Sequence, residues 1–101
     1  MKEPQTASSL DLTTKVLASK DVLGAELGGE ISLLNAKSGI YFTLNPVGAS
    51  VWRKIQEARS LAEIKQQLLA EYDVDAPRCE SDLKQLVTEL QSLGLIELIP
   101  S

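Results

Sequence analysis

The sequence predicts one α+β domain in which a small three-stranded antiparallel sheet is followed by three helices. The chain has 101 residues, of which 44% are hydrophobic and 24% are charged, and this composition suits a single globular domain. Between residues 22 and 44, short apolar runs are separated by glycine and asparagine turns, which is the pattern of strands. After Pro46 the apolar residues recur about every 3.6 positions, which is typical of helices.

The predicted strands are Val22–Leu27, Glu30–Leu34 and Ile40–Leu44. Gly28-Gly29 separates the first two strands, and a two-residue glycine link indicates a tight hairpin. Residues 35–39 end in glycine and connect the second strand to the third. In the third strand, successive side chains point to opposite faces of the sheet, and the sequence does not decide which set packs in the core.

Each predicted helix has a start or stop signal. Asn45-Pro46 opens the first helix with a cap and a helix-starting proline. Ser60 and Glu63 form a capping box for the second helix, which residues 73–77 interrupt. The third helix runs from about Arg78 to Gly94, where glycine ends it. Its apolar stripe consists of Leu83, Leu86, Val87, Leu90 and Leu93.

The two ends of the chain carry weaker signals. Residues 1–21 are expected to be a flexible N-terminal extension, and residues 22–99 to form the domain. Within the extension, Leu10–Leu17 contains apolar residues without a sustained period. Leu95–Ile99 is a short apolar tail.

The residue inventory argues against an enzyme. The chain has no histidine and one cysteine, which excludes an internal disulfide, a Cys/His zinc cluster and an imidazole base. Cys79 lies in the first turn of the third helix, where the helix dipole would lower the pKa of a thiol, but a half-exposed cysteine without function is the favoured interpretation. The acidic run Glu71, Asp73 and Asp75 lacks the central glycine and distal glutamate of a calcium loop. We expect no catalytic residues, metal or cofactor.

The charge distribution disfavours several kinds of partner. The net charge is −4, and no basic stripe is present to neutralise phosphates. We therefore expect no nucleic acid and no membrane surface among the partners. No apolar run approaches the roughly 18 residues that span a bilayer, and the N-terminus has no signal-peptide core, so a cytoplasmic location is expected.

The third predicted strand has an unprotected edge. Edge strands usually carry charge, proline or a bulge, and the first strand has Gly24 and Glu26. Ile40–Leu44 contains no charged residue, glycine or proline. Either Leu10–Leu17 or Leu95–Ile99 covers this edge, or a peptide from a partner adds a strand to it. The residues alone leave both possibilities open.

Several segments in order resemble the PqqD family. The resemblance extends from about Val22 to Ile96, and its specificity comes from the order and spacing of short patterns. The matching segments are Glu30–Asn35, Gly39–Asn45, Gly48–Trp52, Tyr72–Asp75, Asp82-Leu83 and Leu90–Ile96.

The resemblance implies a winged-helix-like fold that binds the leader segment of a ribosomally made precursor peptide as an added strand. It also implies delivery of that peptide to a separate modifying enzyme, such as a radical S-adenosylmethionine enzyme, or to a leader protease. The implied groove is formed by Ile40, Tyr41, Phe42, Thr43 and Leu44 on the strand and by Asp82, Leu83, Lys84, Leu86, Val87 and Leu90 on the third helix. Of the helix residues, Leu83, Lys84 and Val87 are favoured as lining, and Leu86 and Leu90 as core.

Two alternatives remain. A winged-helix DNA-binding regulator would read DNA with the third helix, but Glu80, Asp82 and Glu89 there would repel phosphates. A scaffold subunit would instead use the bare strand edge for self-pairing, as a homodimer.

Overall fold

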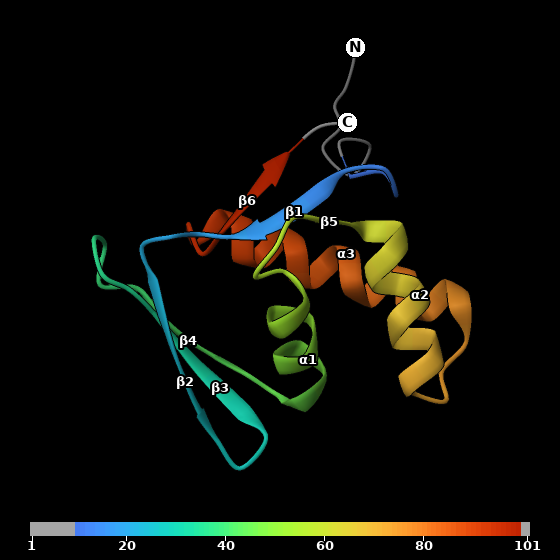
Figure 1. The fold of residues 1–101 in the computed structure, drawn as a ribbon, viewed down its shortest axis with the longest axis horizontal. Coiled ribbons are helices and arrows are strands. Elements are labelled where there is room, and N and C mark those ends of the chain that lie inside the picture. Colours follow the sequence, from blue (N-terminus) through green and yellow to red (C-terminus); the bar gives the residue numbers. More distant parts are fainter. Residues whose placement is uncertain (1–9, 100–101) are drawn as a thin grey trace.

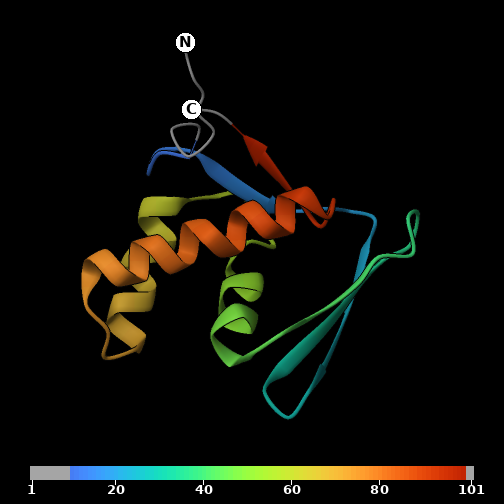
Figure 2. The same cartoon turned by 180° about the vertical axis from the view of Figure 1, so that it is seen from behind.

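The computed structural model of the chain describes residues 10–99. Its helices are α1 (Pro46–Lys54), α2 (Leu61–Glu71) and α3 (Ala76–Ser92). Its strands are β1 (Lys15–Ala18), β2 (Val22–Leu27), β3 (Glu30–Asn35), β4 (Tyr41–Leu44), β5 (Arg59–Ser60) and β6 (Ile96–Ile99). The sheet β2-β3-β4 projects to one side of the helices as a twisted arm, whereas β1 and β6 lie side by side across the top (Figures 1 and 2).

The predicted three-stranded antiparallel sheet is confirmed. Its strands are in the order β2-β3-β4, and the β2–β3 register places Leu27 opposite Glu30. The two glycines between these residues, Gly28 and Gly29, have φ angles of 62° and 84°. Side chains are strained at such angles, so this turn favours glycine.

A second sheet, in the order β5-β1-β6, was not expected from the sequence. In it β1 runs antiparallel to β6, with Lys15 opposite Ile99 and Ala18 opposite Ile96. Val16 is fully buried, and Leu10 also belongs to the core. The expectation of a flexible extension up to residue 21 is therefore wrong for residues 10–21, and residues 1–9 lie outside the described part of the chain.

The predicted helix caps are confirmed. The Asn45 side chain accepts a hydrogen bond from the Gly48 amide at 2.8 Å, and Ser60 and Glu63 form the capping box. The third helix begins earlier than expected, because Asp75 is its cap and Pro77 lies inside its first turn. Proline is tolerated there, since the first amides of a helix have no partner within the helix.

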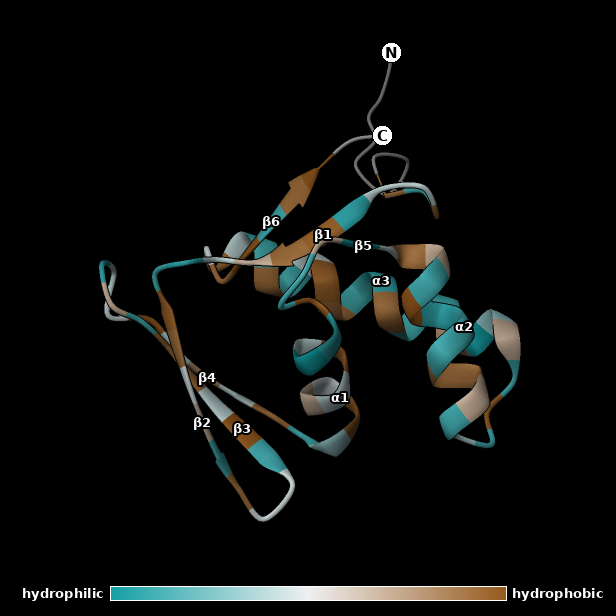
Figure 3. Cartoon of the chain, in the orientation of Figure 1, coloured by the Kyte–Doolittle hydropathy of each residue, from teal (hydrophilic) through white to brown (hydrophobic). Residues whose placement is uncertain are grey.

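The core lies where the helices meet the two sheets. Apolar bands interrupt the polar ones along α2 and α3 (Figure 3), as the periodicity predicted. Trp52 is buried on α1, and Leu33 is the fully buried centre of the projecting sheet. Both sheets and all three helices therefore share one core.

Asn35, at the end of β3, connects the projecting sheet to the end of α3. Its side-chain amide donates a hydrogen bond to the Gly94 carbonyl at 2.9 Å. Its side-chain oxygen accepts from the backbone amides of Lys37 and Ser38, at 2.9 and 3.1 Å. The side chain is buried, so these hydrogen bonds are shielded from water.

Replacing Asn35 by alanine removes all three side-chain hydrogen bonds, including the one that joins β3 to the end of α3. We expect the free energy of unfolding to fall by about 1–3 kcal/mol, measured by urea denaturation. The matched control is Gln91→Ala on the exposed side of α3, for which we expect a change below about 0.5 kcal/mol. Equal stabilities of the Asn35→Ala variant and the wild type would contradict the anchoring role.

Cys79 is buried in the first turn of α3, and not half-exposed as the sequence suggested. Burial is the main cause that raises the pKa of its thiol, and the nearby Asp82 and Asp75 carboxylates raise it further, while Lys65 lowers it. The sequence predicted that the helix dipole would lower this pKa, but burial has the larger effect and the pKa is raised.

A raised pKa and a buried sulfur together predict slow chemistry at Cys79. We expect its reaction with Ellman's reagent at pH 8 to be at least about tenfold slower in the native chain than in guanidinium chloride. Equal rates in the two conditions would show that the thiol is accessible in the folded chain.

Candidate functional site

The outer edge of β4 is unpaired within the described part of the chain. β4 pairs with β3 on one side, and it is the last strand of its sheet. The two segments that could have covered this edge form β1 and β6, which pair with each other instead. Of the two possibilities left open by the sequence, cover from within the chain is excluded for residues 10–99.

The hydrogen bonds of the β3–β4 ladder identify which backbone groups are on the open edge. The Asn35 amide donates to the Ile40 carbonyl at 2.9 Å, and hydrogen-bonded pairs alternate along an antiparallel ladder. In this register the groups of Phe42 therefore point toward β3. The amides and carbonyls of Tyr41 and Thr43 point away from β3, toward the open edge.

The side chains of β4 divide between core and surface. Leu44 is buried, and Phe42 packs partly against the core. Tyr41, which is 65% exposed, and Thr43 lie on the opposite, exposed face. Ile40 precedes the strand and is half-buried. The structure thus decides the orientation that the sequence left open.

A groove of about 440 Å³ lies between β4, the start of α1 and α3. Its strand side consists of Phe42, Thr43, Leu44, Asn45, Val47 and Gly48, and its helix side of Asp82, Gln85, Leu86 and Glu89. Gly48 allows β4 and α1 to approach closely, because a Cβ there would lie 3.1 Å from a Leu44 methyl carbon. The open backbone edge therefore adjoins a cavity with an apolar floor.

The structure brings only some of the expected helix residues to this groove. Asp82 and Leu86 line it. Leu83, Val87 and Leu90 are in the core, with 3%, 0% and 1% of their surface exposed. Leu90 lies in the core as expected, but Leu86, which was favoured as core, lines the groove, whereas Leu83 and Val87, which were favoured as lining, are buried.

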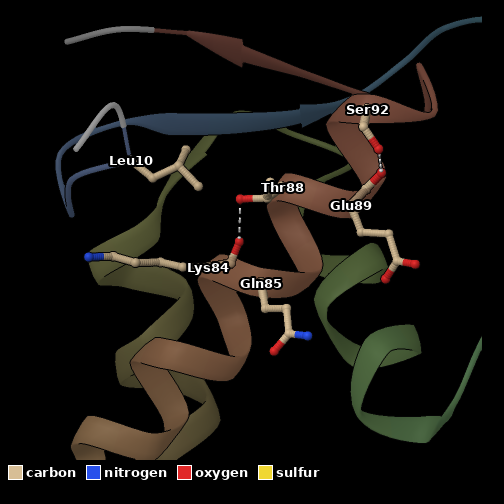
Figure 4. A pocket seen from close by; sticks show the side chains of 6 residues that line it. All are labelled: Leu10, Lys84, Gln85, Thr88, Glu89 and Ser92. Carbon is tan, nitrogen blue, oxygen red and sulfur yellow. Dashed lines mark hydrogen bonds between the residues drawn. The ribbon is translucent and has the colours of Figure 1, made fainter. Parts of the chain in front are cut away.

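Lys84 lies away from the groove. Its ammonium pairs with Glu80 at 3.0 Å, and the residue lines a neighbouring hollow with Leu10 and Thr88 (Figure 4). This hollow adjoins the groove, because Gln85 and Glu89 line both. In that hollow the Thr88 hydroxyl donates to the Lys84 carbonyl, so it is already satisfied within the helix. No strand edge borders this hollow among the residues that line it.

Gln85 and Glu89 line the groove but were not predicted. Both are exposed polar residues on a helix, and such residues usually contact only solvent. A signal was nevertheless present, because residues 82, 86 and 89 are spaced by four and three positions and share one helix face.

The groove continues into a smaller, mostly apolar pocket of about 180 Å³ between the helices. The two cavities share Val47, Asp82 and Leu86. Val74, which is exposed, lies at the pocket, and Leu83 contributes to its lining. This pocket offers space for an apolar side chain at the helix side of the groove.

One cluster resembles catalytic machinery in composition only. The Lys54 ammonium lies 2.8 Å from the Ser50 hydroxyl and 2.8 Å from a Glu71 carboxylate oxygen. The hydrogen bond from Lys54 lowers the pKa of Glu71, so that carboxylate stays charged. Ser50 is buried, and its hydroxyl already donates a hydrogen bond to the Glu71 carboxylate at 2.9 Å. The cluster ties α1 to α2.

Residues 10–99 contain no group of three or more histidine, cysteine, aspartate or glutamate side chains placed to hold a metal ion. None of their helices has the length and apolar character that crossing a membrane requires.

Among curated proteins, the chain is similar to several that carry the name PqqA binding protein. The chain is 38% identical over 55 residues to the PqqA binding protein of Xanthomonas oryzae pv. oryzae strain PXO99A. The same match is found for strain KACC10331 / KXO85. The match covers 54% of this chain and 60% of each relative.

Two solved structures share the fold. TbiB1 in complex with the TbiA(beta) leader peptide is 34% identical with a TM-score of 0.75, over 80% of this chain and 94% of that one. Lasso peptide synthetase B1 complexed with the leader peptide is 28% identical with a TM-score of 0.72, over 81% and 96%. The family model described as "Coenzyme PQQ synthesis protein D (PqqD)" matches residues 30–96, which include the open strand and both groove walls. The resemblance seen in the sequence is thereby confirmed, and the chain belongs to the PqqD family.

Proposed function

We propose that the chain binds the leader segment of a ribosomally made precursor peptide as an added strand on β4 and presents it to a separate enzyme. The observation that carries this proposal is the open edge of β4 beside the groove. Tyr41 and Thr43 supply two backbone donors and two acceptors to a peptide, and the groove receives its side chains.

The energetics of such binding depend on a few apolar contacts. Each backbone hydrogen bond contributes only about 0.5–1.5 kcal/mol to the free energy of binding, because the peptide gives up hydrogen bonds to water when it binds. Fully burying one aliphatic side chain contributes about 1.5–3 kcal/mol. Phe42 and Leu86 in the groove, and Val47 between the two cavities, are the apolar surfaces available for this purpose. We expect them to provide the anchoring, with the strand edge fixing the register of the peptide.

The two similar solved structures support a leader peptide as the ligand, since both proteins are complexed with one. The curated relatives are named PqqA binding protein, and this name likewise describes a binding role. We infer that this chain likewise binds and delivers a peptide and leaves the chemistry to its partner. A radical S-adenosylmethionine enzyme and a leader protease are the two partner classes we propose.

DNA binding is the less favoured function. The exposed side of α3 carries Asp82 and Glu89, and both would face the phosphates of DNA placed against this helix. Two copies of the chain could instead pair through their β4 edges, and the experiment below distinguishes this self-pairing from peptide binding.

The proposal is tested with random peptides of about twelve residues, a length that exceeds the four-residue strand, selected by display on the immobilised chain. We expect peptides with defined affinity for the wild type, measured by fluorescence anisotropy. Thr43→Pro removes an outward amide without taking a hydrogen bond from β3, and it should raise the Kd at least about tenfold. Thr43→Val keeps the amide and serves as the matched control, with an expected Kd within about twofold of the wild type.

Circular dichroism verifies that the Thr43→Pro variant keeps its helices. Equal binding by folded wild type and folded Thr43→Pro would rule out strand addition at β4. Size-exclusion chromatography over a range of concentrations addresses self-pairing, because a dimer that Thr43→Pro dissociates would show the edge occupied by a second copy.

A further inference from the structure

One face of α3 presents acidic groups to the open strand. Asp82, Leu86 and Glu89 lie at successive turns of that face, so an apolar residue stands between two carboxylates. The carboxylates are solvent-accessible, and 68% of the Asp82 side chain is exposed. None of the residues that line the groove is lysine or arginine.

The cations of the described residues compensate this wall only weakly. Lys84 pairs with Glu80 on another side of the helix. Arg78 lies one turn before Asp82, at 3.8 Å, but both side chains are more than two-thirds exposed, and such pairs contribute little. Glu89 makes no ion pair with any residue between 10 and 99. The helix wall of the groove is therefore negative, most of all at Glu89.

A peptide strand bound to β4 would lie against the carboxylates of Asp82 and Glu89 and displace some of the water around them. Desolvating a carboxylate costs free energy unless a positive group compensates it. Residues two positions apart on a strand point to the same face and lie about 6.4–6.8 Å from each other. A long cationic side chain two residues from an apolar one would therefore reach the carboxylates while the apolar side chain contacts Leu86.

We infer that the peptide recognised by this groove carries a lysine or arginine two residues from the apolar residue that contacts Phe42 and Leu86. This inference rests on the strand-addition function proposed above and specifies the chemistry of its ligand. The free strand edge provides binding to many extended peptides, and the acidic wall selects basic ones among them.

The test compares peptides selected from the same random display library on three chains. On the wild type we expect enrichment of lysine or arginine two residues from an enriched apolar position. On Asp82→Asn/Glu89→Gln this enrichment should disappear, and on Glu89→Lys acidic residues should replace the basic ones. The control is Glu97→Lys on β6, in the other sheet, where the wild-type preference should persist.

A double-mutant cycle measures the pairing directly. In a selected peptide, replacing the basic residue by glutamine should weaken binding to the wild type about three- to tenfold. The same replacement should have little effect on binding to Glu89→Gln. Glu89 is exposed, so the variant is expected to fold normally, and thermal denaturation verifies this.

The outcomes separate this inference from the proposed function. Selected peptides that bind in a Thr43-dependent way but show no basic preference would overturn the inference and leave strand addition intact. A library that yields no binding peptide on the wild type would overturn the proposed function itself, and the inference with it.

Discussion

The pairing of β1 with β6 is the interaction on which the functional surface depends. These strands come from the two ends of the described chain and hydrogen-bond to each other over four residue pairs. Since they pair with each other, and β1 also pairs with β5, neither segment covers β4. β4 consequently remains the edge of its own sheet. The molecule therefore has a second sheet, and the edge of β4 stays unpaired within residues 10–99.

The shape of the groove depends on how the projecting sheet is held against α3. Asn35 bonds to the carbonyl of Gly94, just after α3 ends, and so fixes one end of the sheet to that helix. At the other end, Asn45 caps α1 immediately after β4. The strand wall and the helix wall are thus positioned by short polar contacts, while Leu44 and Leu83 belong to the shared core beneath them. A peptide would find this geometry already formed, which reduces the ordering cost of binding.

The candidate site was predictable in outline and not in its side chains. The absence of charge, glycine and proline in Ile40–Leu44 indicated a strand whose edge is chemically unprotected, and left open whether another part of the chain covers it. Periodicity also identified the apolar stripe of α3, but a stripe spans a wide arc of the helix, and only packing decides which flank reaches the surface. The structure buries Leu83 and Val87 and turns Leu86 toward the groove. Glu89 shares a helix face with Asp82 and Leu86, but an exposed acidic residue is common on any helix, so this spacing alone does not distinguish it.

The sequence by itself determined the elements whose signals act over a few residues. Gly28-Gly29 specified the hairpin through its positive φ angles, and Asn45 and Ser60 specified helix starts through hydrogen bonds within one turn. Only the tertiary structure decided that Lys15–Ala18 and Ile96–Ile99 form strands. Leu10–Leu17 has no sustained apolar period and Leu95–Ile99 is only a short apolar tail, so each becomes a strand where the folded core brings the two together. The open edge of β4 is a consequence of that distant pairing, which local patterns do not encode.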